Sequence, residues 1–212
     1  RIAVKVLELL GYDKNALATA LNRMQENMVK ERSNMMYFQS YTHPALVDRI
    51  KKAGIPQNIT SPKYEKEVSF AITSSARLKF EDRRFRQTLP LVDTNIKNGV
   101  ATAEDYILKA NCLLALHNDD TSNNEVLTLI NKAKAIDESN INHYKAEILG
   151  NLRLRKFGVA QQLLQNYIGA LNEMESHLKD IESDITWETN YKFIVSERDW
   201  ANRMSVKVKV MQ

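Results

Sequence analysis

Histidine and cysteine, the side chains that most often bind transition metals or attack substrates, are few in this chain. The histidines are His43, His117, His143 and His177, and no two of them lie four residues apart. A helical H-E-x-x-H motif needs that separation to direct two imidazoles at one zinc ion. We therefore expect no catalytic residue, no metal site and no cofactor within these 212 residues.

Cys112 is the only cysteine, which excludes an internal disulfide and a multi-cysteine metal site. It lies beside Leu113 on the apolar side of an expected helix. A buried free cysteine usually packs as a small hydrophobic residue, whereas a nucleophile needs an activated thiolate. We favour the packing role.

The densest cluster of basic residues raises the question of nucleic-acid binding. The cluster consists of Arg77, Lys79, Arg83, Arg84 and Arg86. Glu81 and Asp82 interrupt it, and the net charge of the whole chain is only +4. A nucleic-acid footprint needs a continuous basic face, so we expect no nucleic-acid partner.

Three aromatic residues near the C-terminus, Trp187, Tyr191 and Trp200, allow two interpretations. They could form a recognition surface, or they could pack into the core. Aromatic side chains on a helix are more often buried, so we expect core positions for them.

The composition is that of an ordinary globular protein. Hydrophobic residues make up 43% and charged residues 26%, with only 6 Gly and 4 Pro. These values exclude a disordered chain and a collagen-like chain. No apolar stretch approaches the roughly 20 residues of a membrane-spanning helix. Residue 1 falls inside an expected helix, so we also expect that this sequence is a piece of a longer protein.

The first quarter of the chain predicts three helices, over residues 1–10, 13–24 and 44–53. Gly11 and Gly54 fit helix C-termini, Asp13 fits an N-cap, and Pro44 fits a first helical position. Residues 55–62 contain two prolines and no periodicity, which predicts a linker.

Helices then follow in pairs. The apolar spacing predicts helices over 68–80 and 83–98, over 103–116 and 125–135, and over 142–154 and 158–171, followed by a mostly helical segment over 178–204. The polar segment 118–124 predicts a loop, and the alternation over 206–210 allows a short strand. Pairs at a period of about 34 to 38 residues are typical of an α-solenoid. The fold class is therefore expected to be all-α, with an ordinary helical bundle as the alternative.

The second and third pairs resemble tetratricopeptide repeats. Leu113, Ala115 and the segment 133–139 match the small residues and the closing phrase of that repeat, and Ala146, Gly150, Phe157 and Ala160 follow in the right order. Phe157 lies two residues too close to Gly150, which departs from the pattern and implies a tighter turn.

Two motifs in the first quarter resemble the C-terminal part of the M48 family of zinc metallopeptidases. Leu10-Gly11-Tyr12-Asp13 with Ala16-Leu17, and Thr42-His43-Pro44 with Asp48-Arg49-Ile50, match two elements of that family in order and separation. The resemblance implies a zinc-dependent endopeptidase as the parent protein, with its zinc ligands before residue 1. It also implies that His43 lies near the mouth of the parent's metal site. The alternative is that His43 simply begins a helix beside Pro44.

Together these patterns give a predicted organisation and function. We expect a helical remnant of a peptidase domain over 1–54, a linker over 55–62, and a tetratricopeptide-like module over 63–212. The expected function is a non-catalytic module that recruits a protein or peptide in its groove for the parent enzyme. The resemblance to repeat-bearing members of this family implies that the protein is located in a bacterial cell envelope or periplasm. The alternative is a helical-repeat adaptor without an enzymatic parent.

Overall fold

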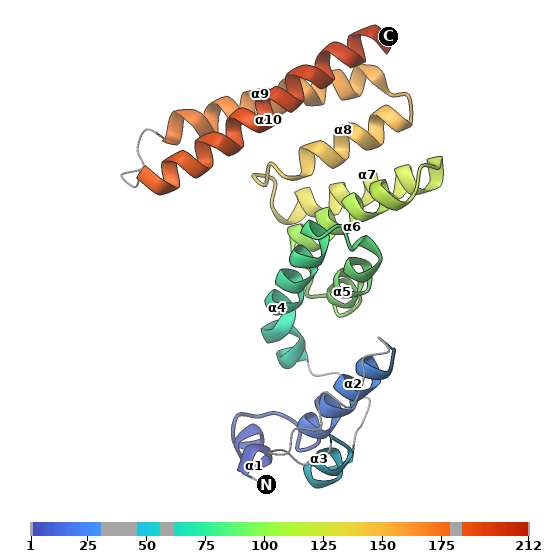
Figure 1. Cartoon of the computed structure of the whole chain (residues 1–212), viewed down its shortest axis with the longest axis vertical. Coiled ribbons are helices and arrows are strands. Elements are labelled where there is room, and N and C mark those ends of the chain that lie inside the picture. Colours follow the sequence, from blue (N-terminus) through green and yellow to red (C-terminus); the bar gives the residue numbers. More distant parts are fainter. Residues whose placement is uncertain (1, 31–45, 56–61, 179–183, 212) are drawn as a thin grey trace. The chain divides into compact units, whose positions relative to one another are not determined.

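The structure, a computed structural model, describes residues 2–30, 46–55, 62–178 and 184–211, and every regular element in these ranges is a helix (Figure 1). The predicted all-α class is therefore confirmed. The chain divides into two compact units, residues 1–68 and 69–212. Most of the predicted linker lies outside the described residues, so the expected domain limits at 54 and 63 stay predictions.

The first unit contains α1 (Ile2–Leu9), α2 (Ala16–Lys30) and α3 (Leu46–Ala53). Gly11 and Gly54 follow α1 and α3 with φ of 81° and 138°, in the left-handed region that favours glycine. The Asp13 carboxylate accepts a hydrogen bond from the Asn15 backbone N–H at 2.6 Å, just before α2. The predicted helix ends at Gly11 and Gly54 are confirmed. The predicted end of the second helix at residue 24 is wrong, because α2 continues to Lys30, and the predicted start at Pro44 lies outside the described residues.

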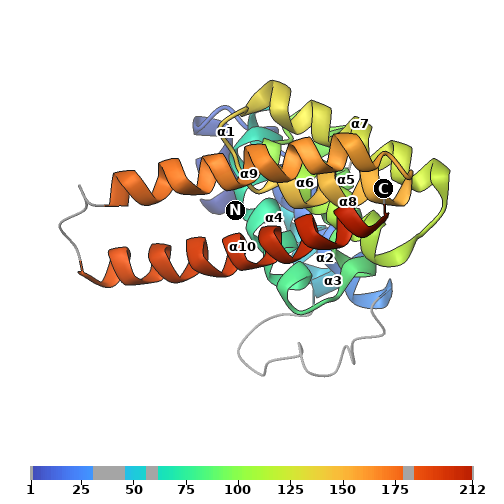
Figure 2. The same cartoon turned by 90° about the horizontal axis from the view of Figure 1, so that it is seen from above.

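The second unit is a succession of helices that begins within α4 (Pro62–Glu81). It continues through α5 (Phe85–Lys97), α6 (Ala103–Leu116), α7 (Asp120–Ile136), α8 (His143–Arg153), α9 (Phe157–Leu178) and α10 (Asp184–Met211). From α5 onward each helix packs against the next, and α6 also contacts α8. The last two helices run side by side in opposite directions (Figure 2).

Buried positions recur along this unit at the spacing of a helical repeat. Ala76, Cys112 and Ile148, from α4, α6 and α8, are fully buried and lie 36 residues apart. Fully buried residues of the intervening helices, Val92 of α5, Ile130 of α7 and Leu164 of α9, are 38 and 34 residues apart. Equivalent positions in successive repeats carry equivalent contacts in a solenoid. The predicted period of 34 to 38 residues thus describes the burial pattern.

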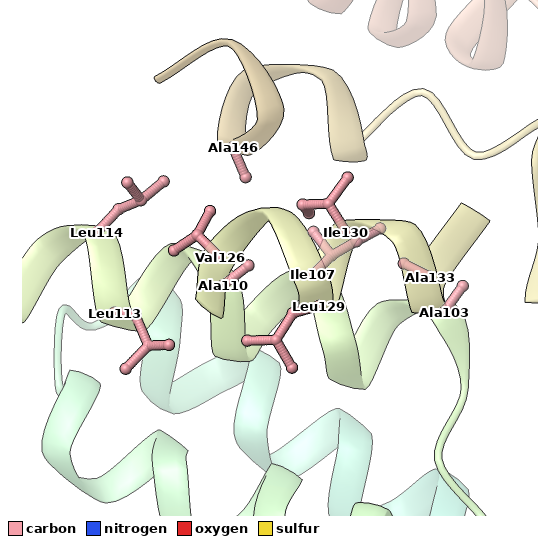
Figure 3. Close-up of a cluster of buried hydrophobic side chains, with 10 residues drawn as sticks. All are labelled: Ala103, Ile107, Ala110, Leu113, Leu114, Val126, Leu129, Ile130, Ala133 and Ala146. Carbon is pink, nitrogen blue, oxygen red and sulfur yellow. The ribbon is translucent and has the colours of Figure 1, made fainter. Parts of the chain in front are cut away.

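Close packing between α6, α7 and α8 depends on small side chains. Figure 3 shows Ala110 and Ala146 among larger residues such as Val126 and Ile130. A Cβ atom added to Gly150 would lie 3.1 Å from Leu127 Cδ2, closer than ordinary van der Waals contact. Alanine and glycine at these positions allow the helices to approach each other.

A buried carboxylate joins the first three helices of this unit. Asp105, at the start of α6, is fully buried. It accepts hydrogen bonds from the Thr73 hydroxyl of α4 at 2.8 Å, from the Asn95 amide of α5 at 3.2 Å, and from the Thr102 backbone N–H at 2.9 Å. These hydrogen bonds replace the hydrogen bonds to water that a carboxyl group loses when it is buried.

The loop predicted over 118–124 is wrong, because α7 begins at Asp120. The Asp119 carboxylate caps the helix, since it accepts from the Ser122 backbone N–H at 2.8 Å and from the Ser122 hydroxyl at 2.7 Å. Asn123 is buried, with 1% of its surface exposed. A polar segment with a good N-cap therefore continues the helix rather than interrupting it.

The short strand considered over 206–210 is also wrong, because α10 extends to Met211. Val208 is fully buried and continues the helical stripe of Ala201, whereas Val206 and Val210 are 65% and 84% exposed. A spacing of seven residues between Ala201 and Val208 fits one face of a helix. In the same way α9 continues to Leu178, seven residues past the predicted end, because Leu171 and Leu178 are both buried.

Candidate functional site

A groove crosses the second unit and is the strongest candidate for a binding site. It has a volume of about 510 Å³ and is lined by residues of α4, α6, α8, α9 and α10 and of the segment between α7 and α8. Its volume lies within the range of ligand-binding sites in proteins. The residues that line it are apolar side chains, asparagines, charged side chains and one tyrosine, Tyr167.

Apolar side chains from three helices line the groove. Ile107 and Leu108 of α6 are almost completely buried. Phe80 of α4 is half-buried, and its ring packs against Phe85 at a centroid distance of 5.4 Å. Phe193 of α10 is 37% exposed. An apolar ligand group could displace water from Phe193 without unpacking the core.

Three asparagines add amide groups to the same groove. Asn111 donates from its side chain to the Ile107 carbonyl at 3.0 Å. Asn140 accepts from the Asn142 backbone N–H at 3.2 Å. Asn142 is exposed, and within the described residues its side chain makes no capping bond to α8. Amide side chains both donate and accept hydrogen bonds, as peptide backbones do.

Two ion pairs join neighbouring helices across the groove. Arg77 of α4 binds both carboxylate oxygens of Glu104 of α6, with Nη2 2.5 Å from Oε2. Lys145 of α8 lies 2.6 Å from Glu197 of α10. Its ammonium group also lies 5.1 Å from the centre of the Trp200 ring.

Tyr167 of α9 completes the second ion pair by donating its hydroxyl proton to Glu197 at 2.5 Å. Burial, and then the hydrogen bond to Glu197, raise the pKa of the Tyr167 phenol. The phenol therefore stays protonated and keeps donating at ordinary pH. Glu197 thus receives a hydrogen bond from α9 and an ammonium group from α8.

Glu81, in the last turn of α4, is the fifth charged residue that lines the groove. It is exposed, and no ion pair joins it to another of the described residues. Three basic residues around it have other partners: Lys79 donates to Gln87, Arg84 lies 3.7 Å from Asp82, and Arg77 binds Glu104. The pKa of Arg77 is raised chiefly by its hydrogen bond to Glu104 and, to a smaller extent, by the charge of Glu81.

The residues singled out in the sequence have different positions. His43 lies outside the described residues, so its expected place near a metal site stays a prediction. Cys112 is fully buried, as predicted, and burial raises the pKa of its thiol to about 11. Its packing role is therefore confirmed, because a buried thiol with a raised pKa is a poor nucleophile.

The aromatic residues of α10 divide between core and surface. Trp200 packs edge-on against Tyr167, with ring centres 6.3 Å apart. Trp187 and Tyr191 stack on each other at 4.9 Å, but they are 40% and 36% exposed. The expected core positions are therefore wrong for Trp187 and Tyr191. These two rings lie one turn apart on α10, and stacking removes part of the surface of each ring from water.

Metal binding finds no support in the described part of the chain. No three histidine, cysteine, aspartate or glutamate side chains lie close enough together there to hold an ion. The expectation of no metal in these 212 residues, and of a zinc site in a parent protein, stays a prediction.

Most of the groove was missed in the sequence, because no single helix carries its pattern. In the sequence, each of its residues has an ordinary interpretation by itself: Lys145 as a surface cation, Tyr167 as a core aromatic residue and Glu197 as a surface anion. Only the packing of three helices brings them together.

Comparison with known proteins provides no family or relative. No family model, no curated protein and no solved structure matches this chain. Within the described ranges, none of the helices has the apolar length that a bilayer crossing requires.

Proposed function

We propose that residues 69–212 form a binding module that holds an extended peptide segment of another protein in its groove. The observation that carries this proposal is the composition of the groove, in which exposed Phe193 and three asparagines line one continuous surface across the repeats. Concave surfaces of stacked helices are the usual binding sites of solenoid proteins.

An extended peptide suits this surface better than a compact ligand does. Each of its residues presents a backbone N–H and a C=O, which the amides of Asn111 and Asn142 could satisfy. An apolar side chain of the same peptide would cover Phe193. The ion pairs Arg77–Glu104 and Lys145–Glu197 hold the helices that present these groups.

The basic cluster supports a protein partner rather than a nucleic acid. Arg77 binds Glu104, Arg84 pairs with Asp82, and Lys79 donates to Gln87 at 3.2 Å. The carboxylates of Glu104 and Asp82 offset part of the local positive charge. A filter-binding assay should accordingly detect no salt-dependent binding of DNA or RNA, which is the signature of phosphate contacts.

For the parent protein we propose a zinc-dependent endopeptidase of the M48 type, whose substrates or partners this module recruits. The proposal rests on the resemblance of the motifs around Tyr12 and His43. The same resemblance leads us to propose that the protein is located in a bacterial cell envelope. Sequencing the gene upstream of Arg1 tests the proposed parent protein, since H-E-x-x-H followed by E-A-D should be encoded there. A reading frame without these motifs would leave a helical-repeat adaptor with no enzymatic parent.

Peptide binding itself can be tested with a random dodecapeptide library displayed on phage and selected on the whole chain. The groove variant combines Asn142→Ala with Phe193→Ala. The control is Phe70→Ala, which removes an equally large ring that is 71% exposed on α4 outside the groove. We expect selected peptides to bind the wild type and the control but not the groove variant. Equal binding to all three proteins, each folded by circular dichroism, would overturn the proposed function.

A further inference from the structure

The charged side chains of the groove differ in whether they already have a partner of opposite charge. Of the five charged residues that line it, Arg77 and Lys145 are positive, and Glu81, Glu104 and Glu197 are negative. The sum is two positive charges against three negative charges, so the groove as a whole is slightly acidic.

Both cations already have carboxylate partners. The guanidinium of Arg77 uses two of its nitrogens to bind Glu104. The ammonium of Lys145 lies against Glu197, whose side chain is only 12% exposed. An acidic ligand would compete with these carboxylates for the two cations. If it displaced Glu197 from Lys145, that carboxylate would lose its cation while largely buried. Removing one partner from such a pair is costly.

Glu81 is in the opposite situation. It is exposed, and none of the described cations lies within 4 Å of its carboxylate. Its charge acts on Arg77, whose guanidinium is bound to Glu104. Glu81 also lies in the last turn of α4, where the helix dipole is negative and a carboxylate is unfavourable. A cation placed there would interact favourably with both the carboxylate and the helix end. Phe80, the neighbouring residue, lines the same groove.

We propose that the groove prefers peptide segments in which a lysine or arginine accompanies an apolar side chain. The basic side chain binds Glu81, and the apolar side chain packs against the nearby aromatic surface of the groove. This inference rests on the proposed function, because it specifies the chemistry of the peptide that the groove would hold.

The test compares the peptides that the dodecapeptide library yields on three proteins: the wild type, Glu81→Lys, and the control Glu173→Lys. Glu173 is exposed on α9 and does not line the groove. The wild type and the control should enrich lysine and arginine relative to the unselected library. Glu81→Lys should lose this enrichment or favour acidic peptides.

A wild-type peptide is then measured by fluorescence anisotropy. We expect Glu81→Gln to weaken its binding about fivefold, as for a charge-assisted contact at a partly exposed site, and to reduce its salt dependence. Glu173→Gln should change neither. Groove-dependent peptides that are neutral or acidic, or that bind Glu81→Gln unchanged, would overturn the charge preference and leave the proposed function standing. A library without any groove-dependent peptide would overturn both.

Discussion

Arg83 and Arg155 lie 72 residues apart and have the same left-handed backbone conformation, with φ of 59° and 57°. Their N–H groups donate to the carbonyls of Phe80 and Leu152 at 2.9 and 3.0 Å. The residue after each arginine donates to the carbonyl five residues before it, at 2.8 and 2.9 Å. The α4–α5 turn and the α8–α9 turn are therefore copies of one geometry, two repeats apart.

Replacing Arg155 by glycine should stabilise the protein. A left-handed conformation is strained for arginine and unstrained for glycine, so we expect a gain of up to about 1 kcal/mol in the free energy of unfolding. Urea unfolding followed by circular dichroism measures this change. Lys156→Gly, in the same turn but at an ordinary φ, should destabilise instead. A loss of stability in Arg155→Gly would contradict the prediction.

Asp105→Ala should be strongly destabilising. The change removes the carboxyl group to which the Thr73 hydroxyl, the Asn95 amide and the Thr102 N–H all donate. The Ser69 carbonyl remains as an acceptor for Thr73 and Asn95. Two lost buried hydrogen bonds and a lost cap together predict a cost of about 3 kcal/mol. Thermal unfolding checks this against Asp199→Ala, an exposed aspartate of α10. Similar melting temperatures for the two variants would show that Asp105 does not join the helices energetically.

His143 should make the protein less stable in mild acid. Its ring is 3% exposed, and burial lowers its pKa below the ordinary value of 6.5. Nδ1 lies 2.5 Å from the Asn140 carbonyl oxygen, Nε2 lies 3.7 Å from Glu147, and the charges of Lys134 and Asp137 also act on the ring.

Because the unfolded chain takes up a proton on His143 at a higher pH than the folded chain does, this contribution to stability is complete above pH 6.5. It is lost as the pH falls from 6.5 toward the lowered pKa. Denaturant titrations between pH 8 and pH 5.5 should show a smaller loss in His143→Gln, which cannot take up this proton. Parallel losses in both proteins would disprove the effect.

The Cys112 thiol should react with Ellman's reagent only after unfolding. With a pKa raised to about 11, only about one thiol in a thousand is ionised at pH 8, and the side chain is fully buried. In guanidinium chloride the reaction should be complete within the mixing time, and Cys112→Ser should give no signal. Rapid labelling of the native protein would mean that α6 opens readily.

Helix positions could be predicted from the sequence wherever apolar periodicity and an end signal agree. Gly11, Gly54 and Gly99 each end a helix with a positive φ. The predictions for residues 118–124 and 206–210 were wrong because the composition of each segment is compatible both with a helix and with another structure. Asp119 made a polar segment into a helix start, and the buried stripe through Val208 overrode the alternation of three valines.

The candidate site could not be predicted in the same way. Phe80 and Phe193 are more than one hundred residues apart, and both line one groove only because the repeats stack in a fixed register. Glu81 is indistinguishable in the sequence from other surface glutamates. Glu81 is set apart because it makes no close ion pair among the described residues, whereas Arg77 and Lys145 in the same groove are bound to Glu104 and Glu197. This difference depends on which carboxylates the neighbouring helices supply.

The bonds that Glu197 accepts also affect the rate at which a ligand would bind in the groove. Lys145 of α8 and Tyr167 of α9 both bind this one carboxylate of α10, so three successive helices are fixed relative to one another. A site fixed in advance loses little conformational entropy on binding. Association rates should therefore vary little among related peptides, and differences in affinity should arise from their residence times.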